Sequence, residues 1–194
     1  YVSLMRSIFE SVFSKYLALY PDVRNTYFKV MDNFWKPTLG RIKIGNELDE
    51  GSVVKAGGVR LEVISTPGHS AWDITLWEKE RGLLFTGDFL LGKNTTLTGA
   101  MNGFGSDLKN YEFSLKKIKK YLEKARFVLP GHGPCLTSSS DLAEGVLRTV
   151  KRRENRIVQM LSCGRQSFMD IVKGVYHSEG NRLSLVRKLG IVLT

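Results

Sequence analysis

Three residues that can bind a metal ion each follow a short apolar run of the sequence. His69 follows T-P-G after a run rich in β-branched residues, Asp88 follows F-T-G, and His132 follows L-P-G. Short apolar runs bounded by glycine and proline are typical of β-strands. Imidazole and carboxylate groups bind first-row metals such as zinc, and loops above a rigid sheet commonly carry such groups. The three residues therefore predict a metal site built on strand ends.

The three motifs occur in a recognisable order: T-P-G-H-S at 66–70, F-T-G-D at 85–88 and L-P-G-H-G-P at 129–134. In order and spacing they resemble the later metal motifs of the metallo-β-lactamase superfamily. The resemblance implies that His69 ligates one metal ion, that Asp88 bridges two, and that His132 ligates the second. It also implies an α/β fold, the αββα sandwich, and a hydrolase with a metal-activated water. Asp88 is then the catalytic residue as well as a ligand, and the expected cofactors are two Zn²⁺ ions, with Mn²⁺ or Fe as alternatives.

The main motif of that family, H-x-H-x-D-H, is absent from this sequence, whose three histidines are His69, His132 and His177. The chain also begins at Tyr1 without a methionine. We therefore expect an N-terminally incomplete sandwich, which on its own binds metal weakly and is inactive. The alternative is a metal-free family member that acts as a non-catalytic nucleic-acid-binding or scaffolding protein. His177 is interpreted as structural, at the end of a predicted helix.

Two domains are expected, a metallo-β-lactamase-like domain over residues 1–139 and a small helical tail over 140–194. The tail is predicted to hold a long helix that ends near Leu161, two shorter helices and a strand at 190–193. This pattern resembles the winged-helix extension of one branch of the superfamily, the β-lactamase-like ribonucleases. Two residue pairs at predicted helix starts have the three-residue spacing of a capping box. They are Asp141 with Glu144, and Ser167 with Asp170.

Two further features lie close to the motifs. Asp73, four residues after His69, is a candidate for orienting a ligand. The polar loop Lys93–Ser106 follows Asp88 and is long for a segment without periodicity. It is interpreted either as a segment that closes over substrate or as a surface excursion. In the chain between these motifs, residues 110–124 are predicted to form a helix with a lysine-rich solvated face.

Charge and composition limit the kinds of partner that this protein can have. The net charge of +10 permits a polyanion such as nucleic acid. The resemblance leaves the substrate open between an ester or thioester and a phosphodiester, with RNA among the latter. No apolar run reaches the ~18 residues of a membrane-spanning helix, so no membrane partner is expected. The two cysteines, Cys135 and Cys163, are interpreted as free thiols of a cytoplasmic protein.

Overall fold

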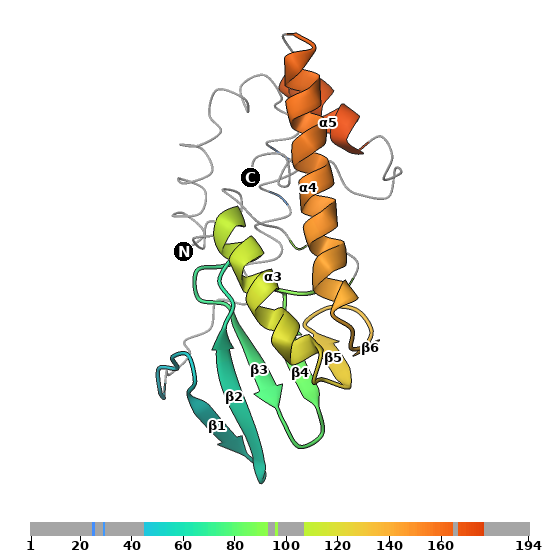
Figure 1. The fold of residues 1–194 in the computed structure, drawn as a ribbon. Coiled ribbons are helices and arrows are strands. Elements are labelled where there is room, and N and C mark those ends of the chain that lie inside the picture. Colours follow the sequence, from blue (N-terminus) through green and yellow to red (C-terminus); the bar gives the residue numbers. More distant parts are fainter. Residues whose placement is uncertain are drawn as a thin grey trace.

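The structure, a computed structural model, describes Asn25, Lys29, residues 45–92, Thr96, residues 107–164 and residues 167–176. These residues form a six-stranded sheet with helices packed on it (Figure 1). The strands are β1 Val53–Ala56, β2 Val59–Ser65, β3 Ile74–Glu78, β4 Leu83–Gly87, β5 Phe127–Pro130 and β6 Leu136–Thr137. The helices are α3 Leu108–Leu122, α4 Asp141–Ser162 and α5 Phe168–Tyr176.

The strands lie in the sheet in the order of the chain, and β4–β5 is the one parallel pair among the neighbours that the structure describes. Antiparallel neighbours need only short connections, such as the Gly57-Gly58 turn between β1 and β2. A parallel pair needs a crossover, and α3 supplies it between β4 and β5. The helix that covers the sheet is therefore also the connection that sets the direction of β5.

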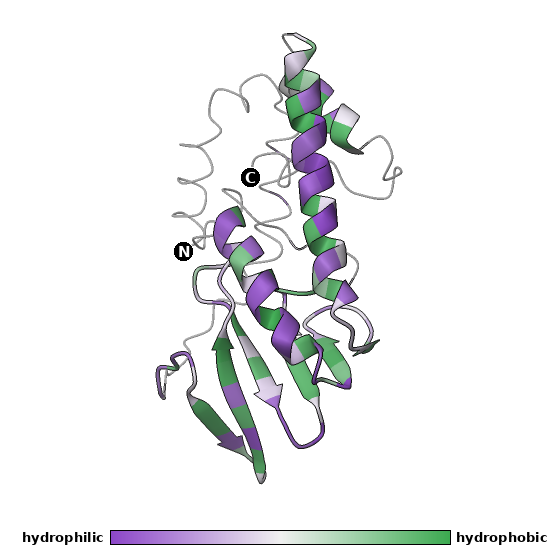
Figure 2. Ribbon diagram, in the orientation of Figure 1, coloured by the Kyte–Doolittle hydropathy of each residue, from purple (hydrophilic) through white to green (hydrophobic). Residues whose placement is uncertain are grey.

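One hydrophobic core joins the sheet to α3 and to the first turns of α4. Figure 1 shows α3 lying against the sheet and α4 extending beyond it. Figure 2 shows hydrophilic residues on the exposed side of α3 and through the middle of α4, as expected for amphipathic helices. The core residues are Ile64, Trp77, Leu84, Phe89, Leu90, Tyr111, Leu115, Ile118, Leu122, Val128, Ala143 and Val146.

The α/β prediction is confirmed by this mixed sheet and its helices. The described ranges hold one sheet with helices on it, and the second sheet and outer helices of a four-layer sandwich are not among them. Ala143 and Val146 of α4 pack in the same core as the sheet. The domain boundary after residue 139 stays a prediction. Of the residues that the structure describes, no helix is both long and apolar enough to span a membrane.

The predicted helix over 110–124 is present as α3, which begins two residues earlier because Asp107 caps it by accepting a hydrogen bond from the Asn110 N–H (2.7 Å). The cap that Ser167 was predicted to make on α5 is confirmed, because the Asp170 N–H donates to Ser167 Oγ. The Ser167 hydroxyl donates to the Asp170 side chain, in place of the backbone bond that completes a capping box. β6 was not predicted, since two residues carry no periodicity. The expected strand at 190–193 and His177 lie outside the described residues.

The predicted capping box of Asp141 with Glu144 is wrong. The N-cap of α4 is Ser140, which makes no side-chain cap hydrogen bond. Glu144 instead accepts a hydrogen bond from Lys119 Nζ of α3 (2.5 Å) and lies 3.6 Å from Arg148 Nη1. These two cations hold the carboxylate away from the N-terminal N–H groups of α4. The pKa of Glu144 is lowered by the hydrogen bond from Lys119 and by the charges of Lys119 and Arg148, which together outweigh the opposing effect of burial.

A second charged cluster ties the turn before β1 to α3. Glu50 accepts hydrogen bonds from the Ser65 N–H (2.6 Å) and from Lys117 Nζ (2.8 Å), which also donates to the Ser65 carbonyl (2.9 Å). Burial acts to raise the pKa of Glu50, but Lys117 and the Ser65 N–H outweigh it and lower the pKa below its ordinary value. The cluster fixes the end of β2, the strand that leads into the first motif.

This cluster predicts a pH-dependent part of the stability. Because the folded pKa of Glu50 is lowered, its contribution is complete above the unfolded value and is lost as the pH falls through the folded value. We expect Glu50→Gln to lower the free energy of unfolding by up to about 1 kcal/mol at neutral pH, since the pair is half exposed, and to change it little near pH 3. Urea unfolding at both pH values measures this. An equal loss at both would contradict it.

Candidate metal centre

The sheet brings the three expected ligands to one edge. β2 and β4 run in the same direction because each is antiparallel to β3, and β5 is parallel to β4. The carboxyl ends of these strands therefore lie at the same edge of the sheet. His69 follows β2, Asp88 follows β4 and His132 follows β5. Each lies on the loop directly after its strand, so the sheet sets the spacing of the three side chains.

Asp88 lies between the two histidines and presents a different oxygen to each. Its Oδ1 is 3.4 Å from His132 Nε2, and its Oδ2 is 3.9 Å from His69 Nε2. Two ligands of one tetrahedral zinc ion, each ~2.0–2.1 Å from the metal, are about 3.3 Å apart. The first separation matches that value and the second exceeds it slightly. The donor set thus fits a carboxylate that bridges two ions, with one histidine on each ion.

This geometry divides the ligands between two positions. Within the described ranges, no group of three or more His, Cys, Asp or Glu side chains is arranged to hold one ion. If Asp88 bridged two ions, each ion would have only two of these three residues as ligands. The His132 side chain is 73% exposed against 22% for His69. The site is therefore open to solvent on the His132 side. That the three residues bind metal stays a prediction.

The loop that carries His69 is clamped by the start of α3. A Cβ atom on Gly68 would lie 2.5 Å from the Tyr111 Cα, and Gly68 has a φ of +151°, so only glycine fits. The Gly68 carbonyl accepts a hydrogen bond from the Asp107 N–H (3.0 Å), and the Pro67 carbonyl accepts one from the Ser114 hydroxyl (2.8 Å). The glycine before His69 thus allows the helix to hold this loop at short range.

Asp73 closes the same loop. It accepts hydrogen bonds from the Ser70 N–H (2.7 Å) and the Ser70 hydroxyl (2.5 Å), while its carbonyl accepts one from the Thr66 N–H (2.8 Å). The Asp73 side chain therefore holds, through its hydrogen bonds to Ser70, the loop on which His69 lies. That Asp73 orients a metal ligand stays a prediction.

Thr96 is a site residue that the sequence did not reveal. Its hydroxyl lies 3.1 Å from His69 Nδ1, and its side chain is 3% exposed. A histidine that binds a metal through Nε2 carries its proton on Nδ1 and donates it to a neighbouring acceptor. Thr96 Oγ1 is placed to accept a hydrogen bond from that Nδ1–H group. The long polar loop after Asp88 was the only signal in the sequence, and it did not single out this threonine.

Gly131 makes room for the carboxylate of Asp88. A Cβ atom at this position would lie 2.6 Å from Asp88 Oδ1. The Gly131 N–H also donates a hydrogen bond to the Gly87 carbonyl (2.7 Å), which joins the loops after β4 and β5. The glycine of L-P-G-H therefore sets the distance between Asp88 and His132.

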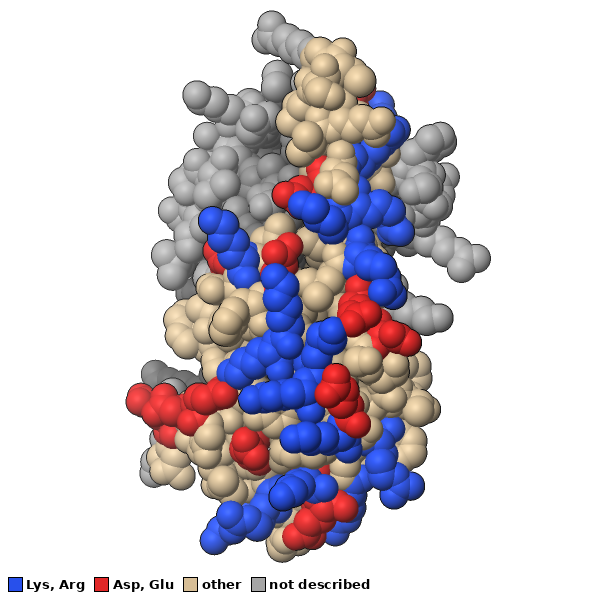
Figure 3. Space-filling view, viewed as in Figure 1, with Lys and Arg blue, Asp and Glu red and all other residues tan. Residues whose placement is uncertain are grey.

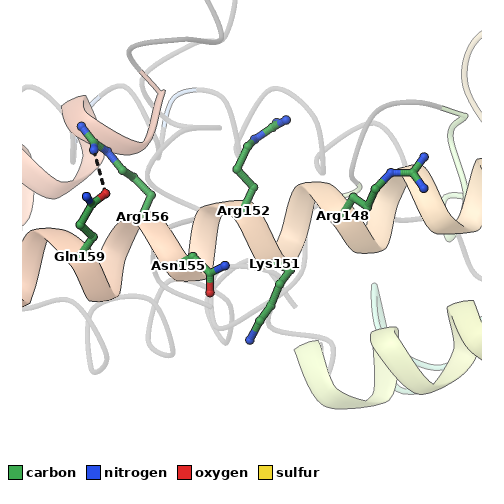
Figure 4. Close-up of a pocket in the computed structure, with 6 residues that line it drawn as sticks. All are labelled: Arg148, Lys151, Arg152, Asn155, Arg156 and Gln159. Carbon is green, nitrogen blue, oxygen red and sulfur yellow. Dashed lines mark hydrogen bonds between the residues drawn. The ribbon is translucent and has the colours of Figure 1, made fainter.

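A basic surface lies on α4, apart from the three motifs in the sequence. Figure 3 shows Lys and Arg side chains gathered over α3 and α4. A groove of about 610 Å³ runs along α4, and Figure 4 shows the side chains that line it. The lining residues that the structure describes are polar or cationic: Arg148, Lys151, Arg152, Asn155, Arg156 and Gln159. Arg148, Arg152 and Arg156 recur every four residues, so they share one side of the helix.

The contact at Gly131 predicts a defect in metal binding. In Gly131→Ala the added methyl group displaces the Asp88 carboxylate, and we expect zinc affinity to fall by about tenfold to a hundredfold. Competition with a chromophoric chelator measures the dissociation constant. Gly145→Ala in α4 is the matched control, because a Cβ there meets only Arg148 Nη2, at 3.9 Å. Equal zinc affinity of Gly131→Ala and the unsubstituted chain would contradict the assignment of Asp88 as a ligand.

Comparison with known proteins supports the family resemblance of the three motifs. The family model of the metallo-beta-lactamase superfamily matches residues 10–132, well over half of the chain. A beta-lactamase-like protein 2 homolog of Caenorhabditis elegans is 32% identical over 149 residues, which cover 75% of this chain and 48% of that protein. An atrochrysone carboxyl ACP thioesterase of Aspergillus fumigatus is 30% identical over 112 residues, covering 58% of this chain and 33% of that protein.

Solved structures share the fold. A metallo-beta-lactamase family protein of Thermus thermophilus has a TM-score of 0.62 at 22% identity, over 78% of this chain and 47% of that one. A beta-lactamase domain protein of Burkholderia ambifaria has a TM-score of 0.56 at 21% identity, over 76% and 44%. The chain spans half or less of the length of the curated relatives named above. Fold, motifs and family model agree, and the chain belongs to the metallo-beta-lactamase superfamily.

Proposed function

We propose that this chain is part of a zinc-dependent hydrolase that cleaves an ester or thioester. The observation that carries the proposal is the position of Asp88, whose two carboxylate oxygens face two different histidines. A metal pair in such a site supplies Lewis-acid activation of water and of the scissile carbonyl. Mn²⁺ and Fe remain alternative metals, because the ligand types accommodate them.

Each side chain has a distinct task in this proposal. His69 and His132 would each bind one ion through Nε2, and Asp88 lies between these two atoms. Thr96 holds the other ring nitrogen of His69 and so fixes the orientation of the imidazole. The exposure of His132 leaves the site open for substrate from that side. Ligands beyond these three are needed for tight binding of two ions.

The proposed substrate class is suggested by the names of related proteins. Proteins of Aspergillus fumigatus and Cryptosporiopsis that resemble this chain bear the name atrochrysone carboxyl ACP thioesterase. Because fold alone does not fix a substrate, these names support an acyl thioester without establishing it. A cytoplasmic location belongs to the same proposal, since both cysteines, Cys135 and Cys163, are exposed free thiols.

Removal of Asp88 tests the proposed function. We expect Asp88→Ala to lose the bridged pair of ions and to lower thioester hydrolysis by at least about a hundredfold. The assay follows thiol release from S-acetyl-N-acetylcysteamine after chelation and return of Zn²⁺, Mn²⁺ or Fe²⁺. It is run on this chain and on the product of the whole gene, because the relatives are longer. Asp141→Ala, which removes an exposed carboxylate at the start of α4, is the control.

The proposal fails if Asp88→Ala keeps both the metal content and the activity of the unsubstituted protein. It also fails if elemental analysis finds no metal in either protein. In that case the site would be vestigial, and the basic surface on α4 would become the leading feature.

That surface supports a second candidate function, nucleic-acid binding, with RNA as a phosphodiester substrate or as the ligand of a non-catalytic protein. Arg148, Arg152 and Arg156 are about 6 Å apart along the helix and line one groove. Arg148 Nη1 lies 3.6 Å from a Glu144 oxygen, and Arg156 donates a hydrogen bond to the Gln159 side chain (3.1 Å). Guanidinium groups bind phosphate oxygens in a bidentate manner, and they have donors to spare beyond such contacts.

The double variant Arg148→Ala/Arg156→Ala tests this second function by fluorescence anisotropy with single-stranded RNA. We expect weaker binding, and we expect the slope of log affinity against log salt to fall by about 0.7 for each phosphate that the variant no longer binds. The double variant Lys55→Ala/Arg60→Ala removes the same charge from the β1–β2 hairpin and is the control. Equal losses in the two variants would indicate net charge instead of a site. An unsubstituted chain that binds neither RNA nor DNA at low salt would exclude the function.

A further inference from the structure

Trp72 is the most exposed large apolar side chain of the described residues, with 76% of its surface accessible. Tryptophan is usually well buried, because its large ring gains much from leaving water. Trp77, on the neighbouring strand β3, follows that rule: it is 5% exposed and lies in the core. The exposure of Trp72 therefore needs a reason other than a lack of core positions.

Trp72 is close in the chain to a residue of the candidate metal centre. It lies three residues after His69 on the loop between β2 and β3. Three residues span at most about 10 Å, so the Trp72 Cα lies within that distance of the His69 Cα. The loop is held by the Thr66–Asp73 backbone hydrogen bond and by the two hydrogen bonds from Ser70 to Asp73. These bonds close the loop, so Trp72 lies on a short closed segment directly after His69, with its side chain exposed.

We propose that Trp72 contacts the acyl chain of the substrate and sets a preference for acyl groups of several carbons. This rests on the proposed thioester hydrolysis and specifies its substrate. A scissile carbonyl at the metal centre places the first carbons of the acyl chain near His69 and Asp88. Because the Trp72 Cα is at most about 10 Å from the His69 Cα, an acyl chain of several carbons is long enough to reach the indole. Each methylene group that packs on the ring leaves water and adds to affinity.

The test uses non-hydrolysable thioethers of N-acetylcysteamine with butyl, hexyl, octyl and decyl chains, and calorimetry measures their dissociation constants. For the unsubstituted protein we expect affinity to rise with chain length by up to about fourfold per methylene group that reaches the ring. Trp72→Ala should lose this rise, and Trp72→Phe should keep part of it because phenyl is also flat and apolar. Since Trp72 is exposed, both variants should fold, which circular dichroism checks.

The matched control is Phe113→Ala, which removes another exposed aromatic ring (65%), from α3, and should keep the full rise. The proposal is overturned if Trp72→Ala keeps the rise with chain length, or if the unsubstituted protein binds none of the thioethers. It is also overturned if Trp72→Ala weakens single-stranded RNA binding alone, since the indole would then stack on a base.

Failure of this inference and failure of the proposed function give different results. Metal-dependent release of thiol from S-acetyl-N-acetylcysteamine, together with a chain-length rise that Trp72→Ala does not change, would remove only the role of Trp72. A rise that depends on Trp72, without hydrolysis at any metal content, would leave an acyl-binding site and remove the hydrolase.

Discussion

The parallel pairing of β4 with β5 is the constraint on which the rest of this structure depends. It requires a crossover, and α3 fills that role while it covers the sheet and supplies Leu115 and Ile118 to the core. It also sends β5 in the same direction as β2 and β4, so that three loops open at one edge. An antiparallel β5 would place His132 at the opposite edge, away from Asp88.

Tyr111 joins the core to the candidate site. Its backbone lies against Gly68, next to His69, and its hydroxyl donates a hydrogen bond to the Phe89 carbonyl (3.0 Å), next to Asp88. Its ring packs edge-on against the Phe89 ring at 5.4 Å, and burial raises the pKa of its hydroxyl. One buried side chain thus fixes two ligand loops relative to each other. The geometry of the site is therefore a consequence of core packing as much as of the loops themselves.

Family membership rests on one part of the molecule, and the surfaces proposed to contact ligands lie on another. The sheet, the glycines of the motifs and the three ligand-type residues are features that belong to the superfamily fold. Trp72 and the arginines of α4 lie on exposed surfaces that the fold does not require. Such surfaces decide which ligand a shared scaffold accepts, because they can change without disturbing the core.

The sequence by itself determined the strands that lead into the motifs and the identity of the three ligand-type residues, while its resemblance to the family implied the α/β class. Those features are local: β-branched runs end at glycine or proline, and His69, Asp88 and His132 follow directly. Only the tertiary structure decided that Thr96 reaches His69 and that Glu144 pairs with Lys119 instead of capping α4. These contacts join residues far apart in the chain, and periodicity and capping rules describe only near neighbours.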